Sequence, residues 1–187
     1  MATKTLISCE EFEALALAEK VSPWAELIDG EIVEMAPGGW EHSYVSLNIA
    51  TIIRDFVRAN KLGHVGTNEA GIHIKSELPR SRGADVVFIS YKRLPKGSRV
   101  KGFLRVPPEL IVEVRSDKDT WAAVEEKVAD YHRTGIDEVW VADPATRTVK
   151  KFFRNAEPVI VHDGSDLDGG AVLPGFKTPV ARFFDEE

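Results

Sequence analysis

The chain has 187 residues, of which 43% are hydrophobic and 29% are charged, and its formal net charge is −6. This composition is typical of a globular protein, and the length predicts one domain over residues 1–187. No apolar run is long enough to cross a bilayer, and the first residues show no signal-peptide pattern. The single cysteine, Cys9, excludes an internal disulfide and a cysteine-cluster zinc site, so we expect a cytoplasmic protein.

The N-terminal third predicts a helix, a hairpin and a second, longer helix. Ser8 and Glu11 have capping-box spacing before a short amphipathic helix that reaches about Lys20. Asp29-Gly30 lies between the apolar runs 26–28 and 31–35, which favours a hairpin with a type I′ turn. Apolar residues then recur at helical spacing over 41–61, before Gly63.

The rest of the chain alternates strands with one more helix. Short strands are predicted over 64–66 and 71–75, followed by a polar, basic loop over 78–83 and an apolar strand that begins with Asp85. A buried strand is predicted over 110–114, a helix over 119–133, a strand over 138–142, a hairpin over 149–154 and 159–162, and an acidic loop over 164–170. This order predicts an α/β fold.

Two acidic residues stand out because each enters an apolar strand. Glu113 lies in the middle of Leu110–Val114, where an unpaired charge would cost several kcal/mol and therefore needs a partner. Asp85 leads the other apolar strand. Two such acids could hold a divalent metal ion between neighbouring strands, whereas the alternative is that each acid ends a strand at the surface.

Cationic residues offer two further candidates. The connection over 91–106 contains no acid, so it is either a solvated loop or a phosphate-binding segment. Lys127 lies three residues after Val124 and four before Tyr131, so it borders the buried face of its helix. It could point at Glu113, or it could be a lysine that extends from the helix flank to solvent. The cations of the connection are Lys92, Arg93, Lys96, Arg99, Lys101 and Arg105.

The motifs together resemble the Uma-type restriction endonuclease-like family of the PD-(D/E)XK nuclease superfamily. The resemblance runs from about residue 24 to the end of the chain. It rests on Glu26-Leu27-Ile28-Asp29-Gly30-Glu31, Met35-Ala36-Pro37 with His42 downstream, Ala84-Asp85-Val86, Pro108-Glu109-Leu110-Ile111-Val112-Glu113-Val114, and Lys127, Tyr131, Gly135, Glu138-Val139-Trp140 and Asp143-Pro144.

The resemblance implies a restriction-endonuclease-like core, with a central mixed β-sheet flanked by helices and preceded by an N-terminal helix and hairpin. It implies that Asp85 and Glu113 are metal ligands, with the Val114 carbonyl as a third and Glu41 or His42 as an added group. Ala84 replaces a proline that the family often has. Arg115 stands where the superfamily has its lysine, and because arginine stays protonated it can bind a phosphate but cannot act as a base. Lys127 is then the substitute.

The sequence therefore predicts an endonuclease that depends on Mg²⁺ or Mn²⁺ and acts on DNA as a homodimer. The alternative is a catalytically inactive module with a nuclease fold that binds nucleic acid or protein. The acidic net charge and Arg115 favour that alternative. Zinc hydrolysis and ATP use are not predicted, because the chain has neither His-x-x-x-His spacing nor a P-loop.

Overall fold

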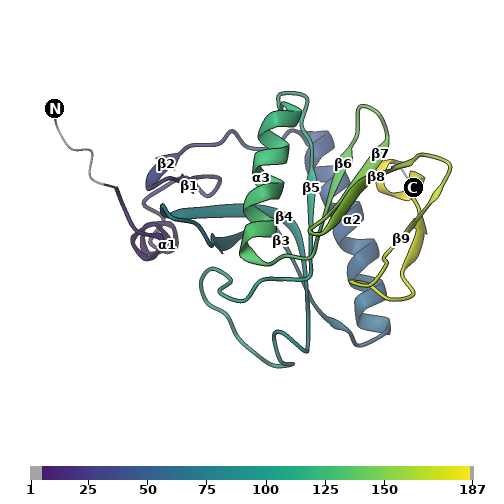
Figure 1. The fold of residues 1–187 in the computed structure, drawn as a ribbon, viewed down its shortest axis with the longest axis horizontal. Helices are drawn as coiled ribbons and strands as arrows, with labels where there is room; N and C mark the ends of the chain where they lie inside the picture. Colours follow the sequence, from purple (N-terminus) through teal and green to yellow (C-terminus); the bar gives the residue numbers. More distant parts are fainter. Residues whose placement is uncertain (1–5, 186–187) are drawn as a thin grey trace.

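The computed structural model describes residues 6–185, which form a central mixed sheet with helices on both faces (Figure 1). The strand order is β2-β1-β4-β5-β6-β7-β8, and β3 pairs with β4 outside this path. Among the paired strands within residues 6–185, only β5 and β6 run parallel, and α3 (Trp121–Thr134) connects them. The strands are β1 (Glu26–Ile28), β2 (Glu31–Val33), β3 (Gly63–Ile74), β4 (Arg80–Ser90), β5 (Leu110–Val114), β6 (Glu138–Asp143), β7 (Thr148–Phe153) and β8 (Ala156–His162).

Each face of the sheet has its own apolar layer. The helix α2 (Trp40–Ala59) packs Ile49 and Ile53 on the face that carries Val112. On the opposite face, α3 packs Val128 near Ile111. Successive strand residues point to opposite faces, so an unbroken apolar run such as 110–112 serves both layers. The predicted fold class, a mixed sheet flanked by helices, is confirmed. No helix within residues 6–185 is long and apolar enough to span a membrane.

The N-terminal elements form as the local sequence predicts. The helix α1 (Cys9–Leu17) begins with a complete capping box, because Ser8 Oγ accepts the Glu11 N–H and Glu11 Oε2 accepts the Ser8 N–H. It ends three residues before the predicted Lys20. Asp29 and Gly30 have φ of 51° and 78°, the two positive angles that a type I′ turn requires. The hairpin is thus confirmed, although β2 ends at Val33.

Three predicted segments differ in the structure. Residues 63–74 form one strand, β3, rather than two, and an irregularity between Thr67 and Ala70 interrupts its pairing with β4. The predicted loop over 78–83 already belongs to β4 from Arg80 onward, because ion pairs neutralise its arginines. Within the acidic segment, β9 (Asp166–Asp168) pairs with β10 (Lys177–Pro179), and α4 (Ala181–Phe184) follows.

One edge of β4 is shared by two strands, and this arrangement creates the site. β3 pairs along the whole of β4 and so occupies one edge. On the other edge, β1 pairs at Ser81 and β5 pairs over Val86–Phe88. The stretch of β4 from Arg82 to Asp85 therefore lies between the two partner strands, with no strand on that edge within the described chain.

Candidate active site

A pocket of about 660 Å³ opens where β1 and β5 separate along β4. Asp85 from β4, Glu113 from β5 and Lys127 from α3 all line it. Arg115 lines the same pocket, so all four residues that the sequence nominated for catalysis lie around it. Other lining residues include Glu26, Glu41, His42, Glu69, Arg82, Val114 and Lys118.

Asp85 is buried at the point where β5 diverges from β4. Its Oδ2 accepts a hydrogen bond of 2.7 Å from the Val114 N–H. His42 Nε2, in the first turn of α2, lies 3.2 Å from the same oxygen. An added Cβ at Gly38 would lie 2.6 Å from His42 Nδ1, so the glycine loop before α2 allows the ring its position. Of the two candidates on this helix, His42 is the one that reaches Asp85.

The irregularity in β3 is a bulge that lies directly opposite Asp85. Asn68 and Glu69 stand between paired residues on β3, where β4 has only Asp85. Both have positive φ, 67° and 55°, which is strained for residues other than glycine. The bulge turns the Glu69 side chain into the pocket, over Gly83, where a Cβ would collide with Glu69 Oε2. Glu69 could not be identified from the sequence, because a two-residue bulge leaves no periodic signal.

Glu113 is held from the α3 side by a lysine and a tyrosine. Lys127 Nζ donates a hydrogen bond of 2.9 Å to Glu113 Oε2. The Tyr131 hydroxyl donates to Glu113 Oε1 over 2.6 Å and lies 3.0 Å from the Gly83 carbonyl oxygen. Lys127 and Tyr131 are one helical turn apart, so a single face of α3 provides both contacts. The predicted approach of Lys127 to Glu113 is present in the structure.

Another buried acid, Glu26 of β1, connects the hairpin to Lys127. Glu26 Oε1 lies 3.4 Å from Lys127 Nζ, and Oε2 accepts a hydrogen bond of 2.7 Å from Arg82. Arg82 also donates to Asp130, which is fully buried in α3. The arginines for which residues 78–83 were predicted to be a polar, basic loop therefore fix α3 against β1 and β4. Glu26 belongs to one of the sequence motifs, but that motif alone did not indicate this role.

Burial and mutual repulsion set the charges of the acids. Burial raises the pKa of Glu113 to about 8; Lys127 opposes the shift and Asp85 adds to it. Burial also raises the pKa of Glu69. Burial disfavours the ionised form of Asp85 too, but hydrogen bonding and attraction from His42 hold the pKa of Asp85 below its usual value.

The acids favour the charged forms of their two partners, His42 and Lys127. The hydrogen bond to Asp85 raises the pKa of His42. Burial alone would lower the pKa of Lys127, but Glu113 and the neighbouring acids raise it well above its ordinary value. Lys127 is therefore an ammonium ion near neutral pH. It can donate hydrogen bonds and stabilise negative charge, but it cannot accept a proton.

Arg115 has a structural environment of its own beside the pocket. Its Nε lies 3.2 Å from Asp143 Oδ2 without hydrogen-bond alignment, and its Nη1 donates to the Asp119 carbonyl. The guanidinium also lies over the Trp121 ring, 5.6 Å from the centroid. These contacts order the segment between β5 and α3. Glu41 also lines the pocket but is exposed, and within residues 6–185 it makes no side-chain hydrogen bond or ion pair.

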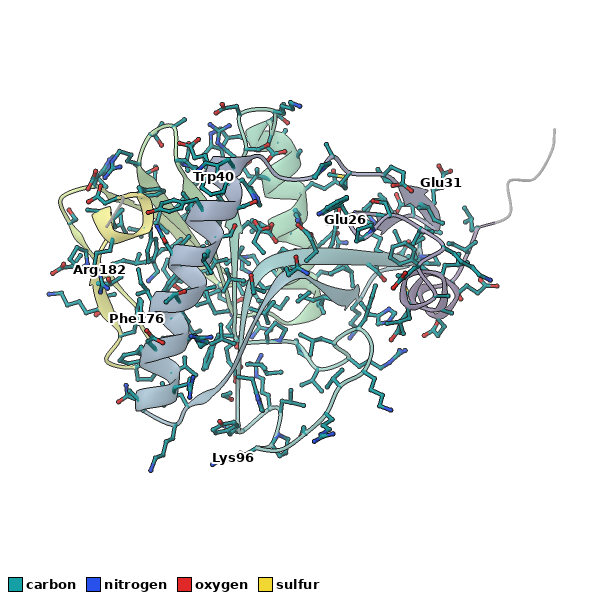
Figure 2. All side chains as sticks on the ribbon, turned by 180° about the vertical axis from the view of Figure 1, so that it is seen from behind. Glu26, Glu31, Trp40, Lys96, Phe176 and Arg182 are labelled. Carbon is teal, nitrogen blue, oxygen red and sulfur yellow. The ribbon has the colours of Figure 1, made fainter. Side chains whose placement is uncertain are left out.

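The basic connection between β4 and β5 lies at the other end of the sheet. It joins the end of β4 at Ser90 to the start of β5 at Leu110, whereas the pocket lies at the opposite end of β5. Figure 2 shows Lys96 far from Trp40, a pocket residue. Arg93 is paired with Glu109 and Asp137, and Arg105 with Glu10 and Glu13. Among the cations of this connection, the exposed ones that make no ion pair within residues 6–185 are Lys92, Lys96, Arg99 and Lys101.

The donor set has the chemistry of a site for a hard divalent cation. Within residues 6–185, no group of three or more His, Cys, Asp and Glu side chains is arranged to hold a metal ion. Mg²⁺ does not need such a group, because one or two carboxylates with water and substrate phosphate oxygens suffice. Asp85 and Glu113 provide two carboxylates in one pocket, and their repulsion contributes to the raised pKa of Glu113. These residues fit a hard, oxygen-bound ion.

Comparisons with known proteins agree with this architecture. No curated protein matches the chain. A crystal structure of a protein from Anabaena variabilis, described as a "putative nuclease", superposes with a TM-score of 0.79. It is 16% identical and the match covers 95% of this chain and 97% of that one, so it shows a shared fold. The Uma2 family model, described as "Putative restriction endonuclease", matches residues 9–181, so the chain belongs to this family, as its motifs predicted.

Proposed function

We propose that the protein is a divalent-metal-dependent endonuclease that hydrolyses phosphodiester bonds in DNA. The observation that carries this proposal is the contact between Lys127 and Glu113 in the pocket that also contains Asp85. A charged lysine beside buried acids in a pocket is a candidate functional group, and phosphodiester hydrolysis requires charge of both signs at one point.

Asp85 and Glu113 would hold Mg²⁺ or Mn²⁺. When bound, such an ion polarises the scissile phosphate and lowers the pKa of a coordinated water. The Val114 N–H and His42 orient the Asp85 carboxylate, and Tyr131 orients that of Glu113. These hydrogen bonds and the contact with His42 restrict the rotamers of Asp85 and Glu113. Metal sites commonly hold their ligands in place through such neighbouring groups.

Lys127 has the position and charge to act on the reacting phosphate. Its ammonium group would orient the attacking water by hydrogen bonding and stabilise the extra negative charge of the transition state. Glu26, 3.4 Å from Nζ, would keep the side chain directed into the pocket. Arg115, held by its own partners, would contact a substrate phosphate at the rim.

Cleavage assays with matched variants test this proposal. Glu113→Gln should lower the rate of DNA cleavage in Mg²⁺ by about a hundredfold or more, because it removes a ligand charge and the partner of Lys127. Glu125→Gln is the control, since Glu125 is exposed on the same helix and, within residues 6–185, pairs only with Lys150. EDTA should abolish cleavage by the wild type.

Equal cleavage by wild type and Glu113→Gln would refute the site. A wild type that binds DNA without cutting it, at any Mg²⁺ or Mn²⁺ concentration, would instead support the inactive nuclease-fold module.

We further propose that the exposed cations of the connection between β4 and β5 bind the DNA backbone away from the cut. Replacing Lys96, Arg99 and Lys101 with Ala should reduce the slope of log affinity against log salt by roughly 2 to 3, because each neutralised phosphate contributes about 0.7 to 0.9. The control removes Lys20, Lys177 and Arg182, an equal charge elsewhere, and should leave the slope unchanged. If both triple variants lose the same slope, only net charge matters and the connection is a solvated loop.

A further inference from the structure

Three large apolar side chains are exposed around the mouth of the acidic pocket. Trp40 is 85% exposed, Met35 is 44% exposed and Trp24 is 39% exposed, and all three line the pocket. They come from the segments before and after the hairpin and from the first residue of α2. We call Trp24, Met35 and Trp40 the apolar rim. Figure 2 shows Trp40 at the end of α2 nearest the hairpin that carries Glu26.

The fold does not require Trp40 at this position. Its only ring contact among the described residues is an offset stack on Tyr44, with 6.5 Å between centroids and 26° between the planes. Neither apolar layer of the sheet includes it. A single exposed tryptophan is normal, but exposed apolar side chains that gather around one pocket are typical of a ligand-binding site.

The rim and the acids together specify a ligand with two chemistries. Asp85, Glu113 and Lys127 form the polar floor of the pocket, to which the proposed function assigns the scissile phosphate. Lys118 is exposed and also lines the pocket, and it makes no ion pair within residues 6–185. A flat apolar group joined to phosphates fits this combination. An unpaired nucleotide strand supplies that group in its bases, whose faces stack on tryptophan regardless of sequence.

We propose that the apolar rim stacks unpaired bases, so that the substrate is DNA with a single-stranded segment at the site of cleavage. This inference rests on the proposed function and specifies its substrate. In a fully paired duplex each base is already stacked between neighbours, and reaching Trp40 would require the cost of flipping a nucleotide out. A strand that is already unpaired avoids that cost. One catalytic centre is enough for such a substrate, so the predicted homodimer is not needed for it.

Binding measurements on the Glu113→Gln protein in Mg²⁺ test the inference without cleavage. Two probes are used, a 20-nucleotide single strand of dT and a 20-base-pair duplex. The single strand should bind more tightly than the duplex and quench tryptophan fluorescence. Adding Trp40→Ala should weaken single-strand binding about tenfold, the effect expected for losing one base stack, and change duplex binding less than about twofold. Trp40→Phe should restore most of the single-strand affinity, because the ring remains.

Two control substitutions separate stacking from other uses of an apolar surface. Leu47 is 62% exposed on α2 and does not line the pocket, and Ile160 is 53% exposed on β8. Leu47→Ala and Ile160→Ala should each bind the single strand as the parent does. If Leu47→Ala weakens binding as much as Trp40→Ala, or if Trp40→Ala dissociates a dimer seen by sedimentation, the rim is a protein interface and the inference is overturned.

The remaining outcomes distinguish the inference from the function on which it rests. Equal affinity for both probes, unaffected by Trp40→Ala, overturns the stacking rim while cleavage by the wild type still supports the nuclease. If neither the single strand nor the duplex binds, both the stacking role of the apolar rim and the proposed nuclease function are overturned.

Discussion

Lys127→Ala is expected to lower the rate of DNA cleavage by about a hundredfold or more while leaving Mn²⁺ binding intact. Lys127 Nζ lies 2.9 Å from Glu113 and 3.4 Å from Glu26, and these acids keep it charged. A group that stabilises transition-state charge in a shielded site contributes effects of this size. It does not ligate the metal, so Mn²⁺ affinity should stay the same or increase. Single-turnover cleavage at saturating Mn²⁺ measures the rate, and calorimetry measures the binding.

Two companion variants distinguish catalysis by Lys127 from general damage. Lys127→Arg keeps the charge and should recover part of the rate. Arg115→Ala should chiefly raise KM, with kcat changed less than about tenfold, because Arg115 is held beside the pocket by Asp143 and the Asp119 carbonyl. Full activity in Lys127→Ala would leave Arg115 as the remaining catalytic cation. Melting curves identify any variant that has lost its fold.

Asp85→Asn is expected to abolish Mn²⁺ binding at concentrations that saturate the wild type. Asn keeps an acceptor for the Val114 N–H, so the junction between β4 and β5 should remain formed. The substitution removes the charge of one of the two carboxylates, and the affinity for a hard divalent ion depends on that charge. Asp55→Asn serves as the control, because Asp55 is exposed on α2 and its pairing with Arg54 is loose, at 3.9 Å. Calorimetric titration compares the three proteins.

Unchanged Mn²⁺ binding in Asp85→Asn would remove Asp85 from the ligands. Weak binding that persists in Asp85→Asn but is lost in His42→Ala would assign the ion to the α2 side of the pocket instead.

Local sequence signals predicted the elements that local interactions determine. The capping box at Ser8 and the positive-φ pair at Asp29-Gly30 each depend on a few neighbouring residues. The helical position of Lys127, between Val124 and Tyr131, indicated which face it occupies, and the structure places it on Glu113. A charge inside an apolar strand was informative for the same reason, because its cost requires a partner.

Features that depend on pairing between distant strands could not be predicted in this way. The bulge that directs Glu69 into the pocket follows from the register of β3 on β4, not from any motif. The arginines of residues 78–83 indicated a polar, basic loop, because their partners, Asp29 and Asp130, are far away in the sequence. The roles of Glu26 and Trp40 likewise depend on how the hairpin and α2 meet at one pocket.

A crystal structure of the protein soaked in Mn²⁺, with anomalous diffraction to locate the ion, tests the proposed catalytic centre directly. We expect one peak within bonding distance of carboxylate oxygens of both Asp85 and Glu113, with the Lys127 side chain still in the pocket. A peak at another place, or no peak between these two acids at Mn²⁺ concentrations that support cleavage, would contradict the proposed catalytic centre.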